Sequence, residues 1–341
     1  MSVAAHAQTS SPWCLSIIIE WANTVWNGDE RAIKLLDRLS QEWLAIRAGR
    51  YPNDLPATAV EFLRRCGPSL ELLIVSGSAG VRGLEANIRS RMPESVDVSV
   101  HVAEGLEYYP LKNFGARLAR GDFLLFVDCD VLPEEDWLAH LIGSFGRPEV
   151  DAVCGQTYVA PTDLVTRAFA LGWTYPLRDP AGHMVQAGKF YANNLAFRTQ
   201  VFRETEFPSI GVRTRGASSM IQTELGHRGI PIWENSNARV DHPPPSSFRH
   251  LAVRGLAHGR DVYMKRSQDR NMYGLMRSVG IAGFRLGRGV YRTFRSWRRV
   301  GLKAWELPAA IAIFSSYYAF FALGGVLTHV NPTAMGRRFR V

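Results

Sequence analysis

Two aspartates separated by one residue, Asp128 and Asp130, come directly after the apolar run from Phe123 to Val127. Two carboxylates at the end of a buried strand repel each other and lose hydration. A divalent cation relieves both effects, and carboxylate oxygens are ligands that suit Mg²⁺ or Mn²⁺. Such an ion can bridge a diphosphate and stabilise the charge that develops on a leaving nucleotide. We therefore predict a divalent metal site at Asp128 and Asp130.

An Asp-x-Asp pair by itself is more often a solvated turn than a metal site, so its flanks matter. Pro133-Glu134-Glu135 follows the pair, and Pro and acids are favoured in the first turn of a helix. A buried strand therefore precedes the two aspartates, and a helix is predicted over 133–145 after them. These flanks favour the metal site over the solvated turn.

Short apolar runs alternate with amphipathic stretches along the first half of the chain. Such runs are typical of a parallel sheet that helices cover on both faces. We predict strands at 15–19, 72–75, 98–100, 123–127 and 150–154, and helices at 29–46, 114–120 and 133–145. Ligands of such sheets bind beyond the carboxyl ends of the strands. Glu20, Ser76 and Asp128 each follow a strand, and we expect them to line one crevice.

The alternation of strands and helices stops after Gly155. Residues 161–192 are rich in aromatic residues, Gly and Pro, and we predict a substrate-facing insertion there. A short strand is predicted at 193–197 and a hairpin at 232–240. A helix at 250–264 is expected to follow the Pro243-Pro244-Pro245 run, which ends the main body.

The segment from Lys112 to Asp122, the apolar strand after it and Asp128-Cys129-Asp130 together resemble the core of family 2 glycosyltransferases. The resemblance covers roughly residues 15–265, and 112–138 is its most specific part. It implies the GT-A fold, an α/β nucleotide-binding fold with a mostly parallel central sheet. It also implies inverting, metal-dependent transfer of a sugar from a nucleotide-sugar donor, with a glycan or a glycolipid as acceptor and a hexosyltransferase-like activity in polysaccharide biosynthesis.

The resemblance also implies roles for single residues. Asp128 and Asp130 match the metal-diphosphate motif, and His242 matches a position near the metal in some branches. Paired amides suit hydroxyl-rich ligands, and Asn193 and Asn194 match the sugar and acceptor side. The residues expected to bind the nucleotide sugar are Glu20, Asn23, Ser76, Lys112, Asn113, Asp128, Asn193 and Asn194.

Two departures from the family pattern affect the mechanism. The second strand ends in Ser76-Gly77-Ser78, where the family usually has acids that hold the nucleoside. The acidic pair that usually supplies the general base is expected near 216–222, and that stretch contains no acid. Glu224 is the nearest carboxylate, and we take it as the first candidate for the base.

The positive charge of the chain is concentrated at its C-terminal end. Residues 265–341 contain 14 Lys or Arg against Asp269 and Glu306, a charge of +12, so residues 1–264 carry −3 of the total +9. Five arginines from Arg285 to Arg299 recur at steps of three and four, which places them on one face of a helix predicted over 281–303. An uncharged stretch of 21 residues, 307–327, is long enough to enter a bilayer.

We therefore expect this end to bind anionic lipids rather than nucleic acid, and to hold the protein at the cytoplasmic face of the membrane. The predicted organisation is a flexible N-terminus at 1–14, a glycosyltransferase domain at 15–265, a basic amphipathic helix at 266–303 and a membrane-associated segment at 304–341. Two alternatives stay open. One is a nucleotidyltransferase, which the absence of a Gly-rich basic loop after the first strand disfavours. The other is an inactive membrane-bound binding protein that has lost its base.

Overall fold

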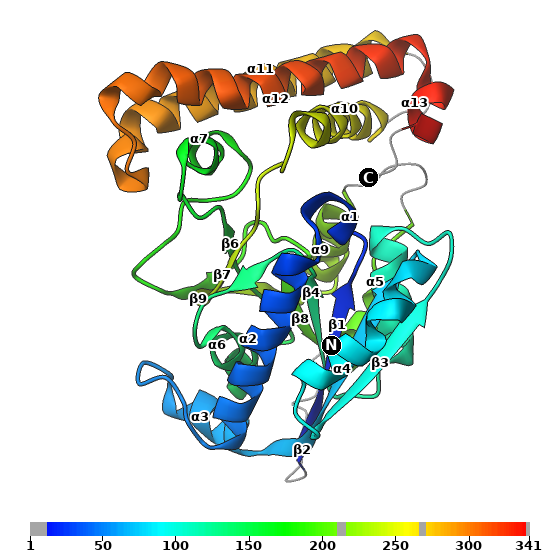
Figure 1. Ribbon diagram of the computed structural model, residues 1–341, viewed down its shortest axis with the longest axis vertical. Helices are drawn as coiled ribbons and strands as arrows, with labels where there is room; N and C mark the ends of the chain where they lie inside the picture. Colours follow the sequence, from blue (N-terminus) through cyan, green and yellow to red (C-terminus); the bar gives the residue numbers. More distant parts are fainter. Residues whose placement is uncertain (1–11, 210–215, 266–270, 339–341) are drawn as a thin grey trace.

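The computed structural model describes residues 12–209, 216–265 and 271–338. Its centre is a nine-stranded sheet in the order β3-β2-β1-β4-β8-β6-β9-β5, and β7 pairs with β9 (Figure 1). Most of the N-terminal stretch predicted to be flexible, 1–14, lies outside the described residues. The strands are β1 (Trp13–Glu20), β2 (Cys66–Ser76), β3 (Val96–Val102), β4 (Phe123–Asp128), β5 (Leu132–Pro133), β6 (Ala152–Tyr158), β7 (Met184–Gln186), β8 (Asn194–Arg198) and β9 (Ile232–Asp241).

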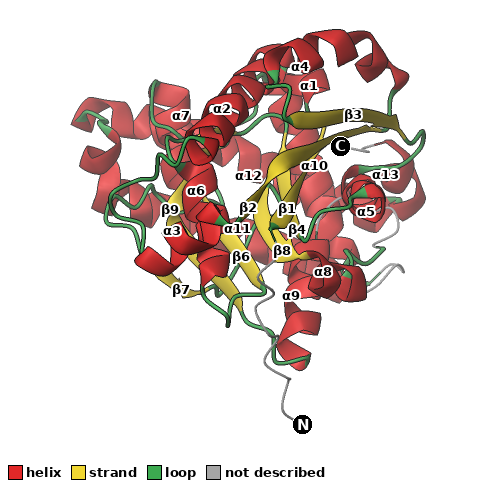
Figure 2. Ribbon diagram, turned by 90° about the horizontal axis from the view of Figure 1, so that it is seen from below, coloured by secondary structure: helices red, strands yellow, loops and turns green. Residues whose placement is uncertain are grey.

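Helices cover both faces of the sheet, as predicted (Figure 2). Successive side chains of a strand point to opposite faces. In β1, Ile17 and Ile19 join the core under α2 and α6, whereas Ile18 joins the core under α5, α8 and α9. The helices are α1 (Thr24–Asn27), α2 (Asp29–Arg47), α3 (Ala57–Arg64), α4 (Glu85–Arg91), α5 (Tyr108–Leu118), α6 (Trp137–Gly143), α7 (Leu164–Gly172), α8 (Thr199–Thr205), α9 (Ala217–His227), α10 (Phe248–Met264), α11 (Met272–Ser296), α12 (Leu307–Val330) and α13 (Pro332–Arg338).

The predicted parallel sheet is present from β3 to β4, where all neighbouring strands run parallel. Glu20 at the end of β1 is the register partner of Asp128 at the end of β4, so these two acids lie side by side. The second half of the sheet is mixed, because β8 runs antiparallel to both β4 and β6. The sheet is therefore mostly parallel where it carries the acids.

The hairpin predicted at 232–240 is wrong. Residues 232–241 form one strand, β9, which pairs parallel to β6 with a shift of register after Gly155. Residues 236–238, with Ser236 and Asn237 that resemble a turn, are the extra residues of this irregularity. A side chain at Gly155 would collide with the carbonyl oxygen of Ala238, so the glycine lets the bulge close against β6.

Two predicted helices begin elsewhere. The helix expected at 133–145 begins only at Trp137, because Leu132–Pro133 pairs with β9 as β5. Glu42 of α2 accepts hydrogen bonds from the backbone N–H groups of Asp136 and Leu138 and so caps this later start. The helix expected at 114–120 already begins at Tyr108, which places Lys112 and Asn113 inside α5.

The C-terminal helices form a third layer at one end of the molecule (Figure 1). α10, α11, α12 and α7 share a core that contains Phe169, Trp173, Phe314 and Tyr317. α10 and α12 approach each other closely at glycines: a side chain at Gly259 would collide with the backbone of Phe321, and one at Gly324 with the backbone of Leu256. One face of α12 is therefore packed against the rest of the protein.

Candidate active site

A cavity of about 670 Å³ lies beyond the carboxyl ends of β1, β2 and β4. Glu20, Ser76 and Asp128 line it from the strand ends, as the alternating pattern predicted. The opposite side is formed by segments that are distant in the sequence. These are Tyr175 and Tyr191 from the stretch between α7 and β8, His242 after β9, and His250 and Arg254 on α10.

Asp128 is held by groups of α5. Lys112 Nζ lies 2.6 Å from Asp128 Oδ1, and the lysine side chain is fully buried. The Tyr108 hydroxyl lies 3.0 and 2.9 Å from the two carboxylate oxygens and donates to this carboxylate. Burial and the neighbouring Asp128 raise the pKa of Tyr108 well above its usual value, so the hydroxyl keeps its proton. The negative charge of Asp128 is therefore already compensated within the protein.

Asp130 has a different environment. Asn27 Nδ2 donates to Asp130 Oδ2 over 2.8 Å, whereas Asp130 Oδ1 is buried without a hydrogen-bond partner. Arg31 donates to the backbone carbonyl of Asp130 over 2.6 Å and to the carboxylate of Asp241 over 2.9 Å. Arg31 thus joins the loop of Asp130 to the end of β9 without contacting the Asp130 carboxylate.

His242 completes a group of three potential metal ligands. One ligand atom from each of Asp128, Asp130 and His242 lies within 4.8 Å of the other two. His242 Nδ1 lies 2.7 Å from the carbonyl oxygen of Pro243, so this nitrogen carries the proton and Nε2 keeps a lone pair. Burial, with a smaller contribution from Arg254, lowers the pKa of His242 to about 3, which keeps the ring neutral. A neutral imidazole and the unpartnered Asp130 oxygen fit a divalent cation.

Glu20 is a buried acid next to this group. Its Oε1 accepts a hydrogen bond from the backbone N–H of Ala22 over 2.7 Å, and its Oε2 is buried without a partner. Burial and the adjacent Asp128 raise the pKa of Glu20 to about 8. The carboxyl group is therefore mostly protonated at neutral pH, and it can donate a hydrogen bond to a ligand.

The structure separates the predicted asparagines. Asn23 and Asn193 line the cavity. Asn113 instead exchanges two hydrogen bonds with the backbone of Phe207, and Asn194 binds Trp137 Nε1 and the carbonyl oxygen of Ala238. Both of these amides are buried and do not line the cavity. Their polar groups are used within the fold, which is a correction to their predicted contact with a nucleotide sugar.

The predicted base is also misplaced. Glu224 lies on α9, is exposed and does not line the cavity. The carboxylates that do line it, among the described residues, are those of Glu20, Asp29, Glu107, Asp128 and Asp130. The prediction failed because Glu224 was chosen by its distance along the chain, whereas α9 turns its buried face, with Ile221 and Leu225, toward the sheet.

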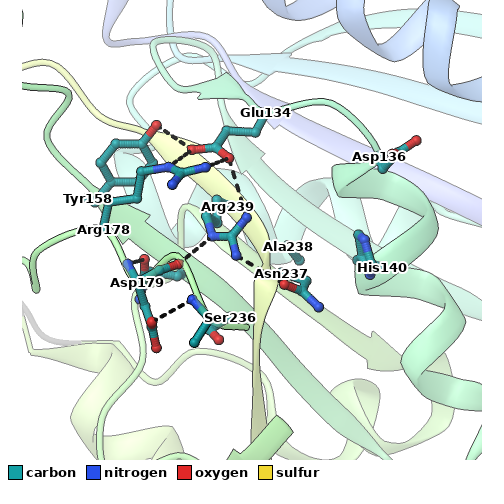
Figure 3. Close-up of polar contacts among 12 residues, drawn as sticks. Glu134, Asp136, His140, Tyr158, Arg178, Asp179, Ser236, Asn237, Ala238 and Arg239 are labelled. Atoms are coloured by element: carbon teal, nitrogen blue, oxygen red, sulfur yellow. Dashed lines mark hydrogen bonds and ion pairs between the residues drawn. The ribbon is translucent and has the colours of Figure 1, made fainter. Parts of the chain in front are cut away.

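A polar cluster fixes the segment that carries Tyr175 and Tyr191. Glu134, four residues beyond Asp130, accepts a hydrogen bond from the Tyr158 hydroxyl over 2.6 Å and a bidentate pair from Arg178 (Figure 3). Arg239 on β9 approaches the same carboxylate and donates to the carbonyl oxygen of Asp179. The segment with Tyr175 and Tyr191 is thereby tied to the chain that follows Asp130.

Several cavity residues have no recognisable signal in the sequence. Arg254 lies in an ordinary helix, and Tyr175, Tyr191 and His250 occupy stretches without a motif. Only the packing of α10 over the sheet brings Arg254 close enough to affect Asp130 and His242 electrostatically. The aromatic content of 161–192 was the one available hint for the two tyrosines.

The site and fold were compared with known proteins. Residues 53–205 match the family model described as glycosyl transferase family 2. No curated protein sequence matches the chain. Among solved structures, the mannosyltransferase PcManGT from Pyrobaculum calidifontis, in complex with GDP-Man and Mn²⁺, is 15% identical with a TM-score of 0.53, and the match covers 95% of this chain and 89% of that one.

Two further solved structures are similar at lower scores. TarS 1–349 from S. aureus is 11% identical over 94% of this chain and 92% of that one, with a TM-score of 0.45. GalNAc-T7 with UDP, GalNAc and Mn²⁺ is 13% identical over 84% of this chain and 54% of that one, with a TM-score of 0.48. The structural assignment rests on the mannosyltransferase, and it agrees with the family match. Residues 53–205 therefore match family 2 glycosyltransferases, and the fold is of the GT-A type.

Proposed function

We propose that this glycosyltransferase moves a sugar from a nucleotide-sugar donor to a glycan or glycolipid acceptor, with inversion and with Mn²⁺ or Mg²⁺ bound at Asp128, Asp130 and His242. The observation that carries the proposal is the group of Asp128, Asp130 and His242 at the strand ends, in which one oxygen of Asp130 is buried without a hydrogen-bond partner and the histidine is neutral. When bound, the ion would supply Lewis acidity to the donor diphosphate.

The residues of the chain have distinct tasks in this proposal. Asn23, Ser76 and Glu20 line the end of the cavity at β1 and β2 and would hold the nucleoside. Lys112 pairs with Asp128 and orients it at the metal site. Arg254 adds a positive charge beside Asp130 and His242, where it would stabilise the leaving diphosphate. Tyr175 and Tyr191 form the wall on the opposite side, which we assign to the acceptor.

Direct displacement requires a base that removes the proton of the attacking hydroxyl. We no longer assign this task to Glu224, because it is exposed and lies outside the cavity. An acid near 216–222 is missing, and a nearby cavity side chain at that helix is Ser218, which bonds the Tyr109 hydroxyl. The base therefore belongs to the groups that do line the cavity.

The test combines a donor screen with a metal-ligand variant. The purified full-length protein is titrated with UDP-, GDP- and TDP-sugars with and without Mn²⁺, and nucleotide binding is measured by calorimetry beside turnover. Asp130→Asn should abolish Mn²⁺-dependent binding and turnover with little loss of stability. Asp97→Asn is the control and should behave like the wild type, because Asp97 is an exposed acid at the far end of the sheet.

Nucleotide affinity that is unchanged by EDTA would refute metal dependence. Retention of the anomeric configuration, seen by NMR of the product, would refute direct displacement.

We further propose attachment to the cytoplasmic face of a membrane. Among the described residues, one helix, 304–330, is long and apolar enough to cross a bilayer. Its inner face packs on α10, α11 and α7 through Phe314, Tyr317 and Phe321, and its outer face exposes Leu323, Val326, Leu327 and Val330. A helix held in this way favours lying along the membrane surface over crossing the membrane.

α11 exposes apolar side chains beside part of the arginine face that was predicted. The outer face exposes Met276, Phe284, Tyr291 and Phe294, each more than half exposed. Arg285 and Arg292 turn inward, because their guanidinium groups reach His258 and the carbonyl oxygen of Ala170 at the C-terminal end of α7. Arg288 is exposed and reaches the carbonyl oxygen of Trp173 at 3.4 Å. Apolar side chains of α11 and α12 would therefore contact the lipid, and Arg285 and Arg292 would not.

A further inference from the structure

The inward arginines of α11 lie against the segment that forms the acceptor side of the cavity. Arg292 donates to the carbonyl oxygens of Ala170 over 2.9 Å and Tyr175 over 3.1 Å, and so caps the end of α7. Arg288 is exposed and reaches only the carbonyl oxygen of Trp173, at 3.4 Å. Arg292 thus has a structural role, whereas Arg288 keeps donors for another partner.

A continuous wall of aromatic rings joins the metal site to these arginines. The ring of His242 lies 5.1 Å from that of Tyr175, which lies 4.6 Å from that of Tyr191. Tyr191 is the end of the wall, and Lys189 Nζ lies 3.0 Å from its hydroxyl. The Tyr191 hydroxyl also donates to the carbonyl oxygen of Thr174 over 2.7 Å. Arg288 and Arg292 donate to the carbonyl oxygens on either side of it, those of Trp173 and Tyr175, so both guanidinium groups lie near the end of the wall.

The arginines of α11 bring positive charge to this end of the wall, and α11 has no acidic side chain that could pair with them. The helix contains Arg277, Arg285, Arg288, Arg292 and Arg295 and no acidic residue. Within the described part of the chain, neither Arg288 nor Arg292 forms an ion pair. Arg288 in turn lowers the pKa of Arg292, second to burial, so the two cations repel each other. An anionic ligand would relieve this repulsion.

We propose that Arg288, with Arg285 and Lys189, forms a subsite for the phosphate or diphosphate group of the acceptor. The inference deepens the proposed function, because it names the acceptor class: a sugar whose ring lies on Tyr175 and Tyr191 and whose anomeric phosphate extends to α11. Tyrosine rings offer apolar faces on which a sugar ring can lie. Guanidinium groups match phosphate oxygens in geometry and charge.

The geometry also separates this subsite from that of the donor. The donor diphosphate belongs at Asp130 and His242, whose ring lies 5.1 Å from that of Tyr175, whereas Arg288 reaches the carbonyl oxygen of Trp173 and does not line the cavity. Apolar side chains are exposed on the outer faces of α11 and α12. A lipid attached to the phosphate would therefore extend from the subsite toward the membrane. A soluble sugar phosphate carries the same anionic group, and the experiment distinguishes the two.

The test measures binding to the full-length protein in EDTA, where the donor metal site is empty. Calorimetry compares farnesyl diphosphate, farnesol and inorganic pyrophosphate as probes. Farnesyl diphosphate should bind, and Arg288→Glu should weaken it about tenfold or more, since one bond to a charged group contributes about that factor. Arg288→Lys should recover much of the loss. Arg295→Glu is the matched control, because Arg295 is exposed on the same helix and contacts Tyr291 on the outer face.

The probes separate the sources of the phosphate. A loss in Arg288→Glu for both farnesyl diphosphate and pyrophosphate supports a site for the anion itself, and a loss for farnesyl diphosphate alone supports a lipid-linked acceptor. Equal affinities of the wild type for farnesyl diphosphate and farnesol would overturn the proposal, as would equal losses in Arg288→Glu and Arg295→Glu.

Binding to vesicles of phosphatidylcholine with phosphatidylglycerol is the last measurement. If Arg288→Glu weakens vesicle binding as much as diphosphate binding, the arginine meets headgroups and the subsite is refuted. Mn²⁺-dependent nucleotide binding should be unchanged in Arg288→Glu, which keeps this test independent of the proposed reaction.

Discussion

Lys112 Nζ and Asp128 Oδ1 are 2.6 Å apart in the interior, whereas Asp130, two residues further on, has a carboxylate oxygen with no partner. The two aspartates appear equivalent in the sequence, but they are not equivalent in the fold. α5 supplies the lysine that pairs with the first, and the second is left for a ligand. The asymmetry leaves Asp130 with the freer carboxylate for a metal, whereas Lys112 and Tyr108 fix the orientation of Asp128 beside it.

Removing the lysine should therefore destabilise the fold. Lys112→Met leaves the Asp128 charge buried and unpaired, and we expect a loss of about 3 kcal/mol in the free energy of unfolding. The double variant Lys112→Met with Asp128→Asn should recover part of this loss, because the unpaired charge is gone. Urea unfolding of the wild type, both single variants and the double variant measures the coupling. Additive effects of the two substitutions would show that the pair does not act as a unit.

Glu20 should make stability depend on pH. Its pKa is raised from 4.5 to about 8 in the folded protein. Between these values the unfolded chain releases the proton and the folded chain keeps it, so the stability of the wild type falls as the pH rises, and it levels off above the folded pKa.

Glu20→Gln keeps the oxygen that Ala22 binds and removes the titration. In EDTA, the stability of this variant relative to the wild type should rise by up to about 1.4 kcal/mol per pH unit between the two pKa values. Thermal unfolding at a series of pH values measures the difference. A difference that stays constant or shrinks with increasing pH would contradict the assignment.

The close packing of α10 and α12 should be intolerant of added methyl groups. A side chain at Gly324 would collide with the backbone of Leu256, which cannot move aside as a flexible side chain would. We expect Gly324→Ala to destabilise the protein by about 1–3 kcal/mol. Gly283→Ala is the control, because nothing lies near that position on α11, and alanine favours a helix by about 1 kcal/mol over glycine. Similar effects of the two substitutions on the unfolding temperature would argue against tight packing.

The exposed aromatic side chains of α11 should drive membrane binding. Phe284→Ser combined with Phe294→Ser removes two large apolar groups from the outer face, and we expect binding to vesicles to fall by at least tenfold. Binding of the wild type should change little with salt, since apolar contact is not screened as charges are. Vesicle sedimentation at low and high salt measures both effects. Release of the wild-type protein by salt alone would mean that charge, and not apolar contact, holds it at the surface.

The sequence predicts best what depends on neighbouring residues. The strand that leads to Asp128 is apolar throughout, and its position, its burial and its neighbour Glu20 follow from that pattern. Features that depend on distant contacts are not predictable in this way. Glu42 caps a helix nearly 100 residues later, and the polar run in β9 resembles a turn until it is placed beside Gly155.

The arginine periodicity of α11 illustrates the same limit. The spacing correctly indicates that Arg285, Arg288 and Arg292 share one face of a helix. It contains no information on which way that face turns. The orientation is decided by the carbonyl oxygens at the end of α7, more than 100 residues away along the chain. The same limit explains why Glu224 is misassigned and why Arg254 is missed.

The glycine contacts between α10 and α12 have a practical consequence for anyone who wants a water-soluble enzyme. Ending the chain after α10 or at Ser278 removes the partner against which Gly255 and Gly259 pack, and it uncovers the side of α10 opposite Arg254 and His250. A shortened protein that is inactive would then reveal nothing about the need for lipid. Polar replacements confined to the outer side chains of α11 and α12 avoid this confusion, since they keep every helix in place while changing what the surface meets.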